Sequence, residues 1–430
     1  MVLIQGSSMP AQGTEEGPFP VDVSIATEPN NIEAVPTLLK EITNGFDVFA
    51  ASNEGREDLV IKCRALVQAL ETPRETMIHH CWAQTGAIAG LNFGVDSGLW
   101  ILMAQNGDKP QKVDDLAANL GIDNVLLSRL MRHLSAMGYL IEIGEDEYRL
   151  TNYTKAMSIP VIGNSYLAML SCTSAGPMRF HEFSRKRGWV NPTDAKDTAM
   201  MYAYGTNLDT FAWQQFLGYG THFNDHMGSY DLGCLPWMDP GFYPVKERLI
   251  DGADTDPEAP FLVDIGGNVG HDLARFHSYY PKVPGKLILQ DLPVVIGQIR
   301  DLAPAIIRME YDFHTEQPVK GARAYYMRNC LHDWPDDVCD SILARVKAAM
   351  KRGYSRLLIH EHVIPETGAY WEATALDMVM LTLLSAQERT RAAWYNLIET
   401  RAGLNIVKIW SGGKGSQSLI ECELPNDGMD

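Results

Sequence analysis

A cluster of glycines marks one junction where the chain can bind a small polar ligand. The apolar segment FLVDI (residues 261–265) runs directly into GGNVG (residues 266–270), and a helical pattern follows from about His271. Glycine lets the backbone turn tightly after a strand and approach a ligand at the edge where open α/β sheets bind. The junction therefore predicts a nucleotide-like ligand, with a simple turn as the alternative.

An acidic residue stands where a ribose would need one. The next strand pattern ends at Gln290-Asp291, and Asp291 follows Gly267 by 24 residues. A carboxylate there can accept hydrogen bonds from both ribose hydroxyls. No G-K-[ST] follows the glycines, so the junction is not a P-loop, and we interpret the SGGKGS segment near Gly412 as a turn. Together the two signals favour a nucleoside cofactor.

A histidine in the segment LHDWPDD is a candidate general base. The side chain of histidine has a pKa near about 6.5, so neutral imidazole is expected to be mostly available at cellular pH, whereas a phenolic hydroxyl, with a pKa near about 10, keeps its proton there. His332 would then take a proton from a hydroxyl group and make its oxygen nucleophilic. The competing interpretation is that His332 caps the helix expected to start near Asp336.

Two acids and two further histidines carry weaker signals. Glu361 interrupts an apolar strand pattern, where a buried acid is costly without a partner. Glu388 lies in a polar run, so a solvated surface is a fair alternative for it. His360 and His362 flank Glu361, but alternate strand positions point both of them away from it, so we predict no metal site.

The elements that must position these residues alternate between strand and helix after Pro260. Strand patterns cover residues 261–265, 286–290, 305–309, 324–327, 357–363, 406–410 and 418–424, and a helical pattern covers residues 338–350. Such alternation predicts an α/β fold with a Rossmann-like, mostly parallel sheet covered by helices. The last two strands are too close for a helical crossover and predict an antiparallel C-terminal end.

The chain before this sheet is expected to be mainly helical. Residues 1–30 suggest a flexible arm, and helical patterns follow at residues 32–42, 59–70 and 76–103. Residues 113–150 predict two helices and a β-hairpin, which is a winged-helix unit. Residues 156–250 are rich in Met and aromatic residues, which suit either a core or the wall of a pocket for a planar ligand. We expect four regions: 1–75, 76–155 for dimerisation, 156–255 lining a substrate, and 256–430 for catalysis.

The charge and cysteine content narrow the class of protein. With 36 Lys and Arg against 54 Asp and Glu, the net charge is −18, which disfavours binding to nucleic acid. No stretch of about 20 uninterrupted apolar residues predicts a membrane span, and the first residues do not resemble a secretion signal. Seven dispersed cysteines without a C-x-x-C pair indicate reduced thiols. We therefore expect a cytoplasmic protein without membrane or nucleic-acid partners.

Seven segments, in this order, resemble the plant- and fungal-type S-adenosylmethionine-dependent small-molecule O-methyltransferases. They are LVDIGGNVGHDLARF, LILQDLP, MEYDF, YYMRNCLHDWPDD, LLIHEHVIPETG, SAQERT and SLIECEL, within a resemblance that covers roughly residues 80–424. The resemblance implies S-adenosylmethionine as the cofactor and a homodimer as the working form.

The same resemblance implies roles for individual residues. It assigns the base to His332 and the acids that flank and orient it to Glu361 and Glu388. Asp291 would hold the ribose of the cofactor, and Asp312 and Phe313 its adenine. Asn268 departs from the glycine that many relatives have, but asparagine tolerates left-handed backbone geometry. The full set of positions implied to contact S-adenosylmethionine is Asp264, Gly266, Gly267, Asp291, Asp312, Phe313 and Arg328.

The leading hypothesis is methylation of a phenolic or enolic hydroxyl on a bulky, apolar, aromatic or polyketide-like secondary metabolite. One alternative keeps the fold and cofactor but changes the reaction to dehydration or pericyclic cyclisation, without transfer of the methyl group. Retention of His332 argues against that alternative. A second alternative is a regulator that binds DNA through the winged helix, which the net charge disfavours.

Overall fold

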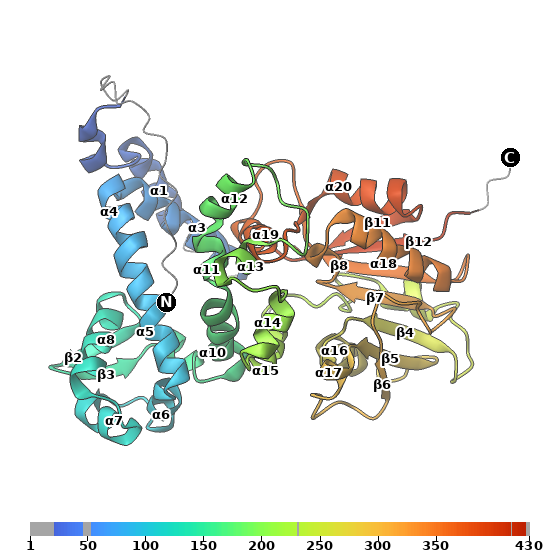
Figure 1. Cartoon of the computed structure of the whole chain (residues 1–430), viewed down its shortest axis with the longest axis horizontal. Helices are drawn as coiled ribbons and strands as arrows, with labels where there is room; N and C mark the ends of the chain where they lie inside the picture. The colour runs from blue at the N-terminus through green and yellow to red at the C-terminus, as the bar shows by residue number, and fades with distance from the viewer. Residues whose placement is uncertain (1–20, 46–52, 230–231, 414, 427–430) are drawn as a thin grey trace. The chain divides into compact units, whose positions relative to one another are not determined.

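The computed structural model describes residues 21–45, 53–229, 232–413 and 415–426 (Figure 1). The chain forms two compact units, residues 1–89 and residues 90–430. Among the described residues no single helix is both long and apolar enough to cross a membrane; by length and composition alone, one bent pair, Pro73–Asp96 with Leu99–Gln105, would qualify.

The first unit consists of helices. Its longest helix, α3, packs beside α1, and the backbone amide of Asn31 donates to the carbonyl of Ala69 at 3.0 Å. Helix α4 begins with a capping box in which Thr72 and Glu75 satisfy each other's backbone amides. The elements are η1 (Val23–Thr27), η2 (Ile32–Ala34), α1 (Val35–Asn44), α3 (Asn53–Leu70), α4 (Pro73–Ile78), η3 (His79–Gln84) and α5 (Thr85–Asp96), the last of which crosses into the second unit.

The flexible arm expected over residues 1–30 lies mostly outside the described residues, and its described part contains the 3-10 turn η1. One prediction for this part of the chain needs correction. The helix expected over residues 76–103 is interrupted, because Gly98 adopts a left-handed backbone conformation with φ of 75° between α5 and α6 (Leu99–Gln105). Glycine adopts that conformation without steric cost, so the chain changes direction there despite its apolar periodicity.

The second unit begins with two helices and a small antiparallel sheet of order β1-β3-β2. Asp123 caps α8 by accepting from the amide of Leu126, and Leu127, Met131 and Leu134 are buried on one face as their spacing predicts. The predicted hairpin is confirmed by the pairing of β2 with β3. The elements are β1 (Gln111–Lys112), α7 (Val113–Leu120), α8 (Asn124–Ala136), β2 (Leu140–Gly144) and β3 (Glu147–Leu150).

A helical region follows and packs against α19 (Trp371–Leu384) from much later in the chain. Met200, Met380 and Leu383 form its buried centre, with Tyr204, Phe211 and Trp213 packed around them. Some of the Met and aromatic residues of this region therefore form a core, whereas Met178, Trp189 and Phe216 are exposed. The elements are α9 (Asn152–Ala156), α10 (Pro160–Tyr166), η4 (Leu167–Ser171), α11 (Ala175–Met178), α12 (Phe180–Lys186), α13 (Ala199–Tyr204), α14 (Thr210–Phe216), α15 (Gly220–Ser229) and η5 (Lys246–Ile250).

A seven-stranded sheet of order β11-β12-β8-β7-β4-β5-β6 forms the rest of the second unit (Figure 1). The five strands from β6 to β8 are parallel, and β12 and β11 continue the sheet in antiparallel fashion, as predicted. The strands are β4 (Pro260–Ile265), β5 (Lys286–Asp291), β6 (Ile306–Glu310), β7 (Ala324–Arg328), β8 (Arg356–Glu361), β11 (Asn405–Ser411) and β12 (Ser418–Glu423).

Helices cover both faces of this sheet. Val263 and Ile265 of β4 pack in the core that contains α18 (Asp336–Ala349), whereas Leu262 packs in the core that contains α16 (His271–Tyr279). The strand expected over residues 357–363 ends at Glu361, because the chain leaves the sheet and β9 (Val363–Ile364) pairs with β10 (Arg389–Thr390). The remaining elements are α17 (Pro293–Ile296), η6 (Leu331–Asp333), α20 (Arg391–Tyr395) and η7 (Asn396–Arg401).

The strand order reverses between β4 and β7. From β4 the chain adds β5 and β6 on one side and then returns to place β7 and β8 on the other. In open α/β sheets, ligands bind at such a switch point, outside the carboxyl ends of the strands. The glycine junction follows β4 and His332 follows β7, so the fold sets the two sequence signals beside each other.

Candidate active site

The turn after β4 packs so closely against its neighbours that only glycine fits at Gly267. The amides of Gly266 and Gly267 donate to the carbonyl of Gln290 at 2.8 and 3.2 Å, which ties the turn to β5. A Cβ atom on Gly267 would lie 2.4 Å from Leu289 and 2.5 Å from the carboxyl carbon of Asp264. Asn268 has a φ of 54°, so the departure from glycine keeps the left-handed geometry, as expected.

Two carboxylates lie under and beside this turn. Asp291 accepts from the amide of Asn268 at 2.8 Å and from that of Leu292 at 2.7 Å. Asp264 is buried, and its Oδ2 has no hydrogen-bond partner among the described residues. Burial raises the pKa of both carboxyl groups, most strongly that of Asp264. A buried carboxyl oxygen without a partner fits a site completed by a hydrogen-bond donor or a cation of a ligand.

The other residues implied to contact a cofactor lie at or after the ends of neighbouring strands. Phe313, after β6, lies 3.6 Å from where a Cβ atom of Gly266 would be. Asp312 accepts from the amide of His314 at 2.9 Å. Arg328 ends β7 and forms an ion pair with Asp272 at 3.1 Å. The glycine turn, Asp291, Phe313 and Arg328 thus come from four strand ends that adjoin one another in the sheet.

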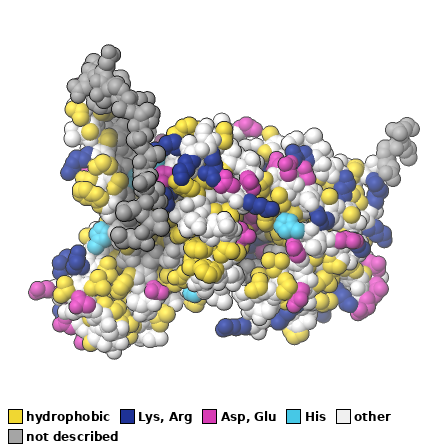
Figure 2. Space-filling model, viewed as in Figure 1, with side chains coloured by type: hydrophobic (Ala, Val, Ile, Leu, Met, Phe, Trp, Pro, Cys, Tyr) yellow, Lys and Arg dark blue, Asp and Glu magenta, His cyan; other side chains and the backbone are white. Residues whose placement is uncertain are grey.

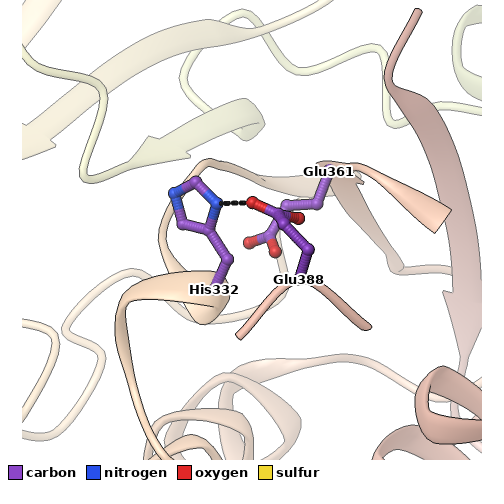
Figure 3. A group of neighbouring side chains, drawn as sticks. All are labelled: His332, Glu361 and Glu388. Atoms are coloured by element: carbon purple, nitrogen blue, oxygen red, sulfur yellow. Dashed lines mark hydrogen bonds and ion pairs between the residues drawn. The ribbon is translucent and has the colours of Figure 1, made fainter. Parts of the chain in front are cut away.

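His332 lies in a short 3-10 turn, η6, directly after β7, and its ring is buried against Glu388 (Figure 3). Its Nδ1 is hydrogen-bonded to Oε1 of Glu388 at 2.5 Å, and its Nε2 lies 3.4 Å from Oδ1 of Asp333. The carboxylate holds the proton on Nδ1, which leaves Nε2 to exchange a proton with a ligand. Helix α18 has no side-chain cap, so the capping role for His332 is wrong.

Glu361 reaches the same turn in a different way. Its Oε1 accepts from the backbone amides of Cys330 at 3.1 Å and Leu331 at 2.7 Å, and so it orients the backbone that carries His332 rather than the imidazole itself. Glu388 is also buried, which rules out the solvated surface considered for it. The nearest polar atoms of His332, Glu361 and Glu388 all lie within 4.8 Å of one another (Figure 3).

The electrostatics of this group differ from the expectation for an ordinary histidine. Burial lowers the pKa of His332, but the carboxylates of Glu388, Asp333 and Glu361 together raise it by more, to about 10. Burial has the opposite effect on the carboxyl group of Asp333, whose pKa it raises to about 7. In the protein without ligands these carboxylates therefore favour the protonated imidazole, contrary to the expectation from its usual pKa.

The histidine turn and the glycine turn are in contact. Cys330, two residues before His332, has its Sγ 2.9 Å from where a Cβ atom of Gly266 would be. The same thiol lies 3.5 Å from the carbonyl of Ile265, the last residue of β4. A ligand seated on the glycine turn therefore lies beside the turn that carries the imidazole.

Two residues of the site were missed in the sequence. Asp333 lies beside His332, and Asp377 accepts from the backbone amide of Glu388 at 2.9 Å. An acid in the otherwise apolar segment 376–386 was the available signal for Asp377.

Two other histidines form hydrogen bonds outside this group. His360 is hydrogen-bonded to Tyr326 at 2.8 Å, and His226 to Ser165 at 3.0 Å. Burial lowers the pKa of His226 to about 4.

Fold and site together are those of an α/β protein with a glycine turn after β4 beside a buried His–Glu pair. Residues 247–405 match the O-methyltransferase domain family. The chain is 34% identical to O-methyltransferase mfmE of Annulohypoxylon moriforme over 90% of its own length and 96% of that protein. The chain therefore belongs to the family of S-adenosylmethionine-dependent small-molecule O-methyltransferases.

Solved structures agree with the fold. The structure titled "Crystal structure of OxaC in complex with SAH and oxaline" matches with a TM-score of 0.81 and 28% identity, over 91% of this chain and 99% of that chain. The structure titled "A Pericyclic Reaction enzyme" matches with the same TM-score and identity, over 91% of this chain and 100% of that chain. Proteins with this architecture thus include one titled for a pericyclic reaction.

Proposed function

We propose that this enzyme transfers the methyl group of S-adenosylmethionine to a phenolic or enolic hydroxyl of a bulky, largely apolar metabolite, with His332 as the general base. The observation that carries the proposal is the buried His332–Glu388 pair in a turn that contacts the glycine turn. Membership of the O-methyltransferase family supports the reaction type.

The residues around the glycine turn fit the cofactor. Gly266 and Gly267 admit a ligand close to the backbone, Asp291 would accept from the ribose, and Asp312 and Phe313 would border the adenine. The unpartnered Oδ2 of Asp264 fits a donor group of the cofactor. When bound, S-adenosylmethionine supplies a methyl group already activated by the positive sulfur, so the protein's task is alignment, exclusion of water and removal of one proton.

His332 would hold that proton at Nε2. Glu388 keeps Nδ1 protonated and stabilises the positive ring that results. The raised pKa of His332, about 10, is close to that of a phenol, so the proton can be shared between the two with little cost. Glu361 would hold the turn in place by accepting hydrogen bonds from the backbone amides of Cys330 and Leu331.

Support for an apolar acceptor comes from the helical region before the sheet. The core that includes Met200 and Leu383 also includes Ala386, two residues before Glu388, and is surrounded by partly buried aromatic residues. We assign substrate binding to residues 156–255, catalysis to residues 256–430 and dimerisation to a winged-helix domain at residues 76–155, after N-terminal helices at residues 1–75.

We propose a homodimer that works in the cytoplasm. Exposed apolar side chains in the first unit support a partner subunit, since Val67, Leu70, Met77 and Trp82 are between 46% and 70% exposed. None of the cysteines forms a disulfide within the described residues, which suits a reducing compartment. On the face of the second unit shown in Figure 2, basic and acidic side chains are interspersed, whereas nucleic-acid binding calls for clustered basic side chains.

The reaction itself is tested by following both products. Incubation with S-adenosylmethionine and a panel of phenolic and enolic polyketides is expected to form S-adenosylhomocysteine in equal amount to methylated acceptor, measured by mass spectrometry. Conversion of an acceptor without S-adenosylhomocysteine would instead establish the dehydratase or pericyclase alternative, which the structural likeness to a pericyclic enzyme keeps in view.

The pH profile is expected to reveal the base. Because His332 must lose its proton before it can accept another, kcat/KM should rise about tenfold per pH unit below the pKa of about 10. In Glu388→Gln one of the carboxylates that raise this pKa is lost, so the rising limb should move to lower pH while the maximal rate falls.

The shift of the rising limb shows whether the pH dependence comes from His332 or from ionisation of the acceptor. A phenol that must ionise would also give a rising profile, but its limb would not move in Glu388→Gln. Profiles measured for both proteins with one acceptor decide between them, and an unmoved limb would contradict the role of His332.

A further inference from the structure

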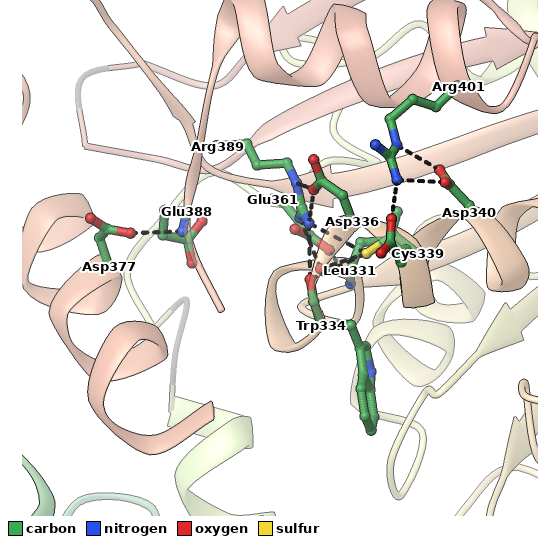
Figure 4. Close-up of polar contacts among 11 residues, drawn as sticks. Leu331, Trp334, Asp336, Cys339, Asp340, Glu361, Asp377, Glu388, Arg389 and Arg401 are labelled. Atoms are coloured by element: carbon green, nitrogen blue, oxygen red, sulfur yellow. Dashed lines mark hydrogen bonds and ion pairs between the residues drawn. The ribbon is translucent and has the colours of Figure 1, made fainter. Parts of the chain in front are cut away.

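A buried arginine holds the turn that carries His332. The Arg389 side chain is fully buried, and its guanidinium donates to the carbonyl of Leu331 at 2.8 Å and to that of Trp334 at 2.9 Å (Figure 4). It also donates to Oδ1 of Asp336 at 3.1 and 2.8 Å, its ionic partner at the start of α18. The guanidinium therefore spans the histidine turn from one side to the other.

The turn depends on such contacts because it has little support of its own. A 3-10 segment of three residues is a weak element in isolation. Glu361 takes the backbone amides that enter the turn, and Arg389 takes the carbonyls at Leu331 and Trp334. The buried Glu361 thus holds backbone amides of this segment, and the buried Arg389 holds its backbone carbonyls.

Arg389 is also joined directly to Glu388, the partner of the imidazole. The two residues are consecutive, Asp377 accepts from the backbone amide of Glu388, and Arg389 in β10 pairs with Val363 of β9. Any displacement of the turn relative to Arg389 therefore changes the distance between His332 and Glu388.

A purely structural role for Arg389 predicts something different. A buried arginine needs an ionic partner, and Asp336 alone would meet that need. Two of its donors nevertheless go to the backbone carbonyls around His332. A rigid, planar donor can fix two carbonyls at once, which lysine, as a point charge, cannot do.

We propose that Arg389 is a positioning residue that sets the geometry of the His332–Glu388 pair, an inference that rests on the proposed role of His332. In Arg389→Lys, kcat is expected to fall roughly tenfold to a hundredfold, because a misplacement of about 1 Å in a catalytic group has effects of that size. The affinity for S-adenosylmethionine and the KM for the acceptor should stay unchanged, since Arg389 contacts neither proposed binding region.

Arg401 provides a matched control. It also forms ion pairs with the first turns of α18, to Asp337 at 2.6 Å and Asp340 at 2.7 Å, but no bond joins it to the histidine turn among the described residues (Figure 4). Arg401→Lys should retain kcat. An equal loss in both variants would mean that α18, and not the turn, is affected, and would overturn the proposal.

A double-mutant cycle identifies the residue through which Arg389 acts. In single-turnover measurements Arg389→Lys should cause no further loss in a His332→Ala background. If the same factor is lost in both backgrounds, Arg389 does not act through His332 and the proposal fails while the role of His332 stands. If His332→Ala alone retains full activity, the proposed base itself is wrong.

A second variant covers the case in which Arg389→Lys does not fold. Asp336→Asn keeps the guanidinium but removes its ionic partner at a half-exposed position. Its kcat should fall by a smaller factor, about threefold to tenfold, again only when His332 is present. Full activity of Asp336→Asn in a protein whose Arg389→Lys variant is unfolded would assign Arg389 to folding alone and overturn the proposal.

Discussion

Replacement of His332 by alanine is expected to lower kcat for methyl transfer by roughly a hundredfold to ten-thousandfold, the range of a positioned general base. The ring is buried, bonded to Glu388 through Nδ1, and lies in a turn whose preceding residue Cys330 contacts the glycine turn. Without the ring, the acceptor hydroxyl has to lose its proton to water from an enclosed site. The affinity for S-adenosylmethionine should be retained, because different residues are proposed to hold it.

Two controls make this result specific. His79→Ala removes an exposed histidine from η3, outside the regions assigned to substrate binding and catalysis, and should leave kcat unchanged. Titration calorimetry with S-adenosylmethionine should give the same dissociation constant for His332→Ala as for the native enzyme. Undiminished methylation by His332→Ala would remove the base from the mechanism, and lost cofactor affinity would point to a collapsed site instead.

The second large effect is expected at Asp291, where alanine should weaken S-adenosylmethionine binding by about tenfold to a hundredfold. Both carboxylate oxygens accept hydrogen bonds, one from the backbone amide of Asn268 and one from that of Leu292. The carboxylate therefore shapes the glycine turn in addition to its proposed role at the ribose. Hydrogen bonds to a charged group contribute roughly 1.5–3 kcal/mol, which corresponds to that range.

Glu310 is the matched control for Asp291. It is the register partner of Asp291 on the neighbouring strand β6, and it is exposed. Calorimetric titrations of Asp291→Ala and Glu310→Ala with S-adenosylmethionine should therefore differ, with native affinity for Glu310→Ala. If Asp291→Ala binds the cofactor as the native enzyme does, the ribose assignment is wrong.

The order of strands and helices in the sheet domain could be read from local patterns. The seven strands match their predicted segments within about two residues, and the antiparallel end formed by β11 and β12 was expected from their short connection. The break at Gly98 was not expected, because apolar periodicity continues through it. Hydrophobic periodicity reports which face is buried, but it does not report where the chain turns.

The polar partners of the site were less accessible to sequence reasoning. His332 and Glu388 were each identified, but the role of Glu388 as partner of the imidazole came from family resemblance alone, since 56 residues separate the two. Glu361 was expected beside the imidazole and instead holds two backbone amides. Arg389 was not singled out, because nothing local distinguishes a buried charge in a polar run from a solvated one.

By itself the sequence determined the elements that depend on near neighbours: the glycine turn after β4, the acid that ends β5, and a histidine directly after β7. Only the tertiary structure decided which carboxylate meets the imidazole, which residues hold its turn, and that the pKa of His332 lies near 10 rather than near its usual value. The physical reason is range. Turn and strand preferences act over a few residues, whereas burial and the distances between charges are set when segments far apart in the chain pack together.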